Sequence, residues 1–332
     1  MTETDTSHGI SRLSVLIPVY NGAATIGSLV DSVVATLGSR FEELEIVAVN
    51  DGSPDDSHAV LLEAVRRHPR ILKYVRLARN FGEHNAVMCG LHYVTGDCVA
   101  IIDDDFQNPP AEIPRLVEKL QEGYDVVYSY YGKKRHSWIR NLGSRFNDLV
   151  ATWLLGKPKG LYLSSFKVLN AFMVRTLIQH EGPFPYLDGI ILRSTRLIGQ
   201  QLCEHQSRSV GESNYTLRRL IALWLNMFTG FSLTPLRVAS VLGFVMSLAG
   251  IGLGVLFTVS RLTGGVFMKR AVPPGWASLI VCVTVFAGLQ LCVLGVMGEY
   301  LGRMFQTTNR APQFIVRDVH GEGITPAADE SP

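Results

Sequence analysis

The chain has 332 residues, of which 47% are hydrophobic and 18% charged, and a formal net charge of +2 at pH 7. This length exceeds one average domain, and so low a charged fraction is unusual for a soluble protein, so part of the chain is expected to face lipid. The small net charge does not indicate binding to nucleic acid. Five cysteines without a C-x-x-C pair indicate neither a disulfide framework nor a zinc site.

The first 12 residues are polar and lack the apolar core of a signal peptide, so the N-terminal part of the chain is expected to stay in the cytoplasm. Beyond them, short apolar runs rich in β-branched residues alternate with helical patterns. The expected strands are Leu13–Val19, Leu44–Asn50, Leu72–Leu77 and Val99–Ile102, and the expected helices are Ala23–Leu37 and Ser57–Arg67. This alternation predicts an α/β fold with a mostly parallel sheet and ligands at the carboxyl ends of its strands.

Two runs of 23 residues, Val238–Ser260 and Trp276–Gly298, contain no charged side chain. Each can cross a bilayer, since roughly 20 helical residues span the hydrocarbon core. The alternative is a pair of buried core helices, which would be unusually long and apolar on every face. Residues 133–155 and 217–231 combine basic residues with Trp or Phe at helical spacing, a pattern that suits either the membrane interface or packing against the sheet.

Polar side chains follow three of the predicted strands at the same edge of the sheet. Strand one ends in Pro18-Val19-Tyr20-Asn21-Gly22, strand two in Asn50-Asp51-Gly52-Ser53, and strand four in the acidic run that starts at Asp103. An acid at the end of strand two is placed to accept hydrogen bonds from a nucleoside. The alternative for Asp51 is a turn residue that caps the next helix.

Asp103, Asp104 and Asp105 form the strongest chemical signal in the sequence. Three adjacent carboxylates repel one another unless a cation holds them together. Their hard oxygen ligands favour Mg²⁺ or Mn²⁺, which could bridge the diphosphate of a nucleotide-sugar. An isolated acidic triplet is weak evidence, and its place at a strand end near Asp51 and Tyr20 is what strengthens it.

Several motifs together resemble the family 2 polyprenyl-phosphate glycosyltransferases of the GT-A fold. They are the run 14–22, the stretch Arg79-Asn80-Phe81-Gly82-Glu83-His84-Asn85, the block 103–114, the sequence Gly211-Glu212-Ser213-Asn214-Tyr215, and the paired C-terminal spans followed by 298–303. Within this family the chain is most similar to transferases that load 4-deoxy-4-formamido-L-arabinose or glucose onto undecaprenyl phosphate, and more distantly to dolichyl-phosphate mannose synthases. The resemblance covers about residues 12–317.

The resemblance implies roles for individual residues. The donor, a UDP-sugar, would be held by Pro18, Tyr20, Asn21, Asp51, Arg79, Asp103 and Asp104. The metal, Mg²⁺ or Mn²⁺, would be held by Asp105, which is thereby catalytic, and by Gln107. The acceptor phosphate would be held by Arg140, Arg145, Lys167, Arg208 and Ser213.

The chain departs from the family where relatives carry an acid proposed as catalytic base, because it has Leu161-Tyr162-Leu163 there. This loss is compatible with a phosphate acceptor, since a phosphomonoester with a second pKa near 6 is already largely dianionic at neutral pH. Asp188 is the candidate for a replacement base, and a helix-capping role for it is equally open. A second departure is Asn214, where relatives carry Lys.

The expected organisation is a disordered N-terminus (1–12), a GT-A domain (13–212), an amphipathic juxtamembrane segment (213–235), a two-helix transmembrane domain (236–303) and a cytoplasmic tail (304–332), disordered beyond 320. The expected function is inverting transfer of a sugar to a polyprenyl phosphate at the cytoplasmic face of a bacterial inner or plasma membrane, which makes a lipid-linked sugar for cell-envelope glycans. A processive polysaccharide synthase and a non-catalytic membrane scaffold are the alternatives. Glycines in the first span are compatible with an oligomer.

Overall fold

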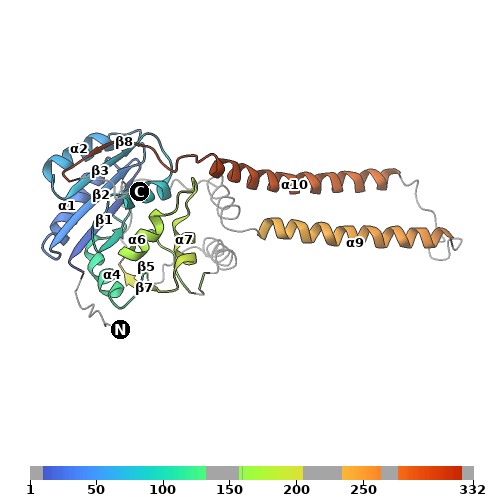
Figure 1. Ribbon diagram of the computed structural model, residues 1–332, viewed down its shortest axis with the longest axis horizontal. Coiled ribbons are helices and arrows are strands. Elements are labelled where there is room, and N and C mark those ends of the chain that lie inside the picture. The colour runs from blue at the N-terminus through green and yellow to red at the C-terminus, as the bar shows by residue number, and fades with distance from the viewer. Residues whose placement is uncertain (1–9, 132–156, 159, 205–233, 263–275, 324–332) are drawn as a thin grey trace. The chain divides into compact units, whose positions relative to one another are not determined.

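The protein is described from a computed structural model, in which we describe residues 10–131, 157–158, 160–204, 234–262 and 276–323 (Figure 1). The chain forms two compact units. One contains the residues before 216 together with those after 309, and the other contains the residues between them.

The first unit is built on an eight-stranded, mostly parallel sheet with the order β7-β5-β6-β4-β1-β2-β3-β8. Its strands are β1 (Arg12–Val19), β2 (Glu43–Asn50), β3 (Leu72–Leu77), β4 (Cys98–Ile101), β5 (Val126–Tyr131), β6 (Lys167–Asn170), β7 (Ile198–Cys203) and β8 (Val316–His320). β1 pairs in parallel with β2 and β4, β2 with β3, and β5 with β7. β6 is antiparallel to β4 and β5, and β8 is antiparallel to β3. The four predicted strands and the mostly parallel sheet are confirmed.

Helices cover both faces of this sheet (Figure 1). α1 (Ile26–Leu37), α2 (Ser57–Arg67) and α4 (Ile113–Leu120), which follows a 3-10 turn at Pro110–Glu112, pack on one face. α3 (Glu83–Leu91), α6 (Ala171–Ile178) and α7 (Leu187–Ser194) pack on the other. Successive residues of β1 point to opposite faces, so Val15 and Ile17 join the first core while Leu16 joins the second. This two-sided burial explains the continuous apolar run in the sequence.

The C-terminal segment differs from the expected tail. β8 is the edge strand of the sheet, and the residues just before it are bound to the same unit. The buried Gln313 donates its amide N–H groups to the carbonyls of His180 (3.2 Å) and Gly182 (2.8 Å). Phe314 packs edge-on against His92, with ring centroids 5.8 Å apart, and Ala78 N–H donates to the Ile315 carbonyl at 2.9 Å. We call residues 313–320 the return segment.

The second unit contains α9 (Thr234–Leu262) and α10 (Trp276–Thr308), which contact each other. Large apolar side chains are exposed along both, among them Phe244 and Leu291. Within the described residues, one helical stretch, Val285–Thr308, is long and apolar enough to cross a membrane, whereas the comparable stretch of α9, Ala239–Gly252, is shorter. One of the two predicted spans is thus supported and the other stays a prediction. The predicted amphipathic stretches 133–155 and 217–231 lie outside the described residues.

Candidate active site

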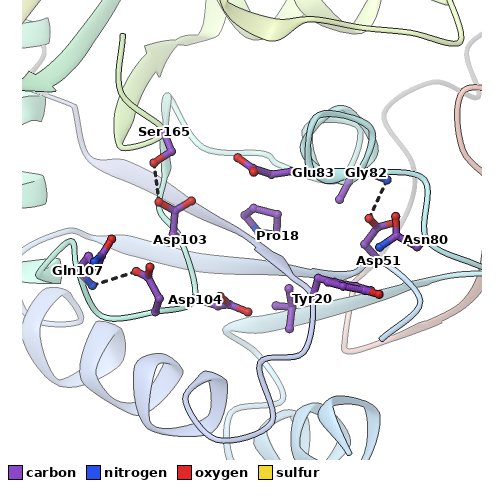
Figure 2. Close-up of a pocket in the computed structure, with 13 residues that line it drawn as sticks. Pro18, Tyr20, Asp51, Asn80, Gly82, Glu83, Asp103, Asp104, Gln107 and Ser165 are labelled. Atoms are coloured by element: carbon purple, nitrogen blue, oxygen red, sulfur yellow. Dashed lines mark hydrogen bonds between the residues drawn. The ribbon is translucent and has the colours of Figure 1, made fainter. Parts of the chain in front are cut away.

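A pocket of about 740 Å³ opens at the carboxyl ends of β1, β2 and β4 (Figure 2). β1 continues to β2 on one side and has β4 on the other, so the strand order reverses here, and such a switch point is where open α/β sheets bind ligands. The pocket is lined by Pro18, Val19, Tyr20, Asp51, Asn80, Gly82, Glu83, Ala86, Asp103, Asp104, Asp105, Gln107 and Ser165.

Asp51 binds the loop after β3, which forms one wall of the pocket. Its carboxylate accepts the backbone N–H groups of Phe81 (2.7 Å) and Gly82 (2.8 Å), and the side chain is 2% exposed. Burial raises the pKa of Asp51, and these two hydrogen bonds oppose that rise. Gly52 adopts φ +62°, and a Cβ there would lie 2.4 Å from the Arg79 carbonyl carbon, so only glycine lets the two loops meet.

Asp103 is held by a chain of polar groups that runs toward β5. Its Oδ2 accepts hydrogen bonds from the Ser165 hydroxyl (2.5 Å) and the Asn108 amide (3.3 Å). The Tyr131 hydroxyl donates in turn to Asn108 Oδ1 at 2.6 Å. Because these partners fix the carboxylate from one side, its orientation toward the pocket is set before any ligand arrives.

Asp105 and Gln107 are joined by a tight turn, in which Gln107 N–H donates to Asp105 Oδ1 at 3.0 Å. Phe106 between them has φ +60°, an uncommon conformation for a bulky residue, and its partly buried ring packs on the core under α1 and α4. Ring burial offsets the backbone strain. Asp104 fits closely against Gly22, where a Cβ would lie 2.3 Å from Asp104 Oδ2.

These residues suit a divalent metal that arrives with a phosphorylated ligand. Asp105 and Gln107 offer hard oxygen atoms, the type that Mg²⁺ and Mn²⁺ prefer. Within the described residues, no three His, Cys, Asp or Glu side chains could hold a metal by themselves. Mg²⁺ usually takes one or two carboxylates and completes its shell with substrate phosphates and water, so the donor set fits such an ion.

Glu83 is a pocket residue that the sequence motifs did not single out. It occupies the first turn of α3 and points into the pocket on the same side as Asp103 (Figure 2). Its place in the sequence, inside the stretch 79–85 that carries the family resemblance, is a signal that could have found it.

Residues 14–178 match the sequence model of the family described as Glycosyl transferase family 2. This part of the chain is a family 2 glycosyltransferase domain. Similar solved structures include glucosyl-3-phosphoglycerate synthase from Mycobacterium tuberculosis with Mn²⁺ and UDP-glucose, at 22% identity and TM-score 0.46 over 64% of this chain and 75% of that one. The same synthase with Mn²⁺, UDP-glucose and phosphoglyceric acid matches at 24% identity and TM-score 0.49, over 64% of this chain and 76% of the synthase chain. A crystal structure described as a mycobacterial protein matches at 20% identity and TM-score 0.49, over 66% of this chain and 73% of that protein's chain. The ligands are those of the synthase.

The family 2 domain brings together most of the predicted donor and metal residues. Pro18, Tyr20, Asp51, Asp103, Asp104, Asp105 and Gln107 line one pocket. Asn21 and Arg79 lie next to it: Asn21 N–H donates to the Ser53 hydroxyl at 3.1 Å, and the Arg79 guanidinium lies over the Phe81 ring. Their roles stay predictions. The predicted acceptor residues Arg140, Arg145, Arg208 and Ser213 lie outside the described residues.

Lys167 and Asp188 pair with each other rather than line the pocket. Lys167 Nζ lies 2.5 Å from Asp188 Oδ1, which also accepts the Tyr128 hydroxyl at 2.9 Å, and the two charged residues are 3% and 9% exposed. The Lys167 ammonium lies 5.0 Å from the centroid of the Tyr128 ring. An acceptor role for Lys167 or a base role for Asp188 therefore requires this ion pair to open, and both stay predictions.

Proposed function

We propose that the protein transfers a sugar from a nucleotide-sugar, most simply a UDP-sugar, to the phosphate of a polyprenyl lipid, with inversion at the anomeric carbon. The observation that carries this proposal is the pocket of a family 2 domain with acids at the ends of β2 and β4, in a chain that also contains a membrane-length apolar helix. The lipid acceptor rests on the family resemblance and on the exposed apolar helices.

Along the sheet edge, the pocket residues suit first the nucleoside and then the diphosphate of the donor. Asp51, Asn80 and Tyr20 at the ends of β1 to β3 suit the nucleoside, and Asp105 and Gln107 after β4 suit a metal ion beside the diphosphate. That ion would be Mg²⁺ or Mn²⁺, which stabilises the negative charge of a departing nucleoside diphosphate. Asp103, fixed by Ser165 and Asn108, would orient the donor between these two ends.

The acceptor chemistry suits a site that lacks the acid proposed as catalytic base in the relatives. Leu161, which replaces the acid of the relatives, is 6% exposed and belongs to the apolar core. A phosphate dianion attacks without first giving up a proton, whereas a hydroxyl acceptor needs a base. The ion pair of Asp188 with Lys167 favours the phosphate acceptor further.

The exposed apolar surface of α9 and α10 supports a membrane location. Contiguous exposed apolar patches are rare on soluble monomers and are stable in lipid. Nucleotide-sugars are cytoplasmic, so the proposed reaction requires the pocket to lie on that side. A processive synthase and a non-catalytic scaffold remain the competing functions.

The test is to incubate the purified protein with polyprenyl phosphate and a panel of nucleotide-sugars and to measure nucleotide release and lipid-linked product. We expect one-to-one release and product formation that stop in EDTA and recover with Mg²⁺ or Mn²⁺. Asp105→Asn should lower turnover at least about 100-fold, and Asp56→Asn, an exposed acid outside the pocket, should not. Products longer than one sugar would indicate a processive synthase, and no turnover with any donor would indicate a scaffold.

A further inference from the structure

Glu83 differs from the other pocket carboxylates whose contacts are described above. Asp51, Asp103 and Asp105 each accept hydrogen bonds from the protein. Glu83 makes no hydrogen bond or ion pair in the described part of the chain, although its side chain lines the pocket. A carboxyl group held in a ligand pocket without a protein partner is available to a ligand.

The charges that face Glu83 come from three elements. Asp103 and Asp104 lie in the loop after β4, Asp188 in α7 and Lys167 in β6. Lys167 is already paired with Asp188 at 2.5 Å, so its positive charge is largely balanced. The surroundings of Glu83 are therefore net negative, and they oppose a further negative charge on its carboxyl group.

The enclosure of Glu83 acts in the same direction. The side chain is exposed to the pocket, yet the protein around it removes part of its hydration. This desolvation, reinforced by Asp103, Asp188 and Asp104 and opposed by Lys167, raises the pKa of Glu83 to about 7. Protons can exchange freely because solvent reaches the group.

We propose that Glu83 contacts the diphosphate of the nucleotide donor and takes up a proton as that anion binds. A neutral carboxyl group donates a hydrogen bond to a phosphate oxygen, whereas a carboxylate in the same place repels it. This inference rests on the proposed function, because it requires the pocket to bind a nucleoside diphosphate. It adds a donor-contacting residue that none of the sequence motifs assigned.

The proton accounts for a specific pH dependence. Binding of an anion favours the protonated form of Glu83, so donor affinity is greatest below the pKa of the free site and decreases above it. With a single linked proton and a pKa of about 7, affinity decreases about tenfold between about pH 6 and pH 8. Uridine diphosphate itself titrates near pH 6, so the informative comparison is between the parent protein and a variant rather than the slope of the parent alone.

The experiment is titration calorimetry of the full-length protein with UDP, at pH 6 and pH 8, in buffers of different ionisation enthalpy, with Mg²⁺ and again with EDTA. We expect the parent to take up a fraction of a proton per UDP near pH 7.5 and Glu83→Gln, which keeps a donor but cannot titrate, to take up less. At pH 8 the variant should bind UDP about tenfold more tightly than the parent, and at pH 6 about equally. Glu118→Gln, an exposed acid of α4, is the matched control and should behave as the parent.

Uridine separates this inference from the proposed function. It shares the nucleoside contacts but lacks the diphosphate, so its binding should show no difference in proton uptake between the parent and Glu83→Gln. Equal proton uptake and equal pH dependence for UDP in both proteins, with and without Mg²⁺, would overturn the role of Glu83 and leave the proposed function standing. Failure of the parent to bind UDP or any other nucleotide would overturn the proposed function itself.

Discussion

At the scale of single residues, the buried Lys167–Asp188 pair shows that a titratable group behind a site can serve structure rather than catalysis. Both side chains are almost fully buried, and the Tyr128 hydroxyl adds a third polar partner. Removing one partner of such a pair leaves an uncompensated buried charge, whereas replacing both with apolar groups is often nearly neutral. A structural role for the pair therefore predicts lost stability when Asp188 is replaced, whereas a base role predicts lost turnover.

Asp188→Asn should destabilise the protein by about 3 to 5 kcal/mol, because the Lys167 charge loses its partner. Lys167→Met combined with Asp188→Leu should recover most of that loss. Chemical denaturation in detergent measures both. Where Asp188→Asn is still folded, its turnover should lie within about tenfold of the parent, since the acceptor phosphate supplies its own nucleophile. Normal stability with turnover reduced about 100-fold would instead identify Asp188 as the catalytic base.

At the scale of elements, the strands that could be predicted from the sequence are those whose own residues indicate a strand. β1 to β4 are apolar runs followed by turn residues, which is the pattern expected for strands buried on both faces of a sheet. β8 reads Val-Arg-Asp-Val-His and becomes a strand only through its pairing with β3, about 240 residues away in the chain. Helix α3 has weak amphipathicity because most of its residues are buried, so its periodicity did not predict it.

The same distinction applies to the site. The acids after β2 and β4 were predictable because the carboxyl ends of parallel strands meet at one edge. The engagement of Lys167 with Asp188, on β6 and α7, depends on how those elements pack on the sheet. The exposure of Glu83 to the pocket depends likewise on the placement of α3, so neither could be read from spacing along the chain.

The return segment is expected to hold β3 and the loop after it in place. Tyr74 of β3 stacks on His320 with centroids 5.5 Å apart, and Ala78, which donates to Ile315, directly precedes the loop bound by Asp51. Gln313→Ala with Phe314→Ala should lower the hydrogen-exchange protection of β3 amides about tenfold or more in the full-length protein. Glu322→Ala, whose nearest ionic partner, Arg70, is 3.8 Å away, is the control. Unchanged protection would show that β3 is stable without this segment.

A fragment that ends before Thr234 lacks β8, so its folding is not expected to match that of the intact sheet.

At the scale of the whole molecule, the position of β8 restricts how the chain can cross a membrane. The chain leaves the first unit before α9 and rejoins it after α10, because β8 pairs with β3. A segment that leaves a domain and returns to it on the same side must cross the bilayer an even number of times. If α10 crosses, a second crossing is needed, and among the described helices α9 is the one expected to supply it, even though its strongly apolar stretch is the shorter of the two.

If both helices cross, a label at position 269, between them, is expected to react only from the side opposite the catalytic domain. Three of the native thiols, Cys89, Cys98 and Cys203, are buried, and burial raises the pKa of Cys98 and of Cys203 to about 12, so these thiols should not react. With Cys282 and Cys292 replaced by Ala, a membrane-impermeant maleimide should label Lys269→Cys in intact spheroplasts and Glu322→Cys only after permeabilisation. Protection of both positions in intact spheroplasts would mean that neither helix crosses, and the reverse labelling would put the pocket on the outer face, where nucleotide-sugars are absent. Labelling of both positions from outside would mean that neither helix crosses and that the first unit, whose sheet contains β8, also lies outside.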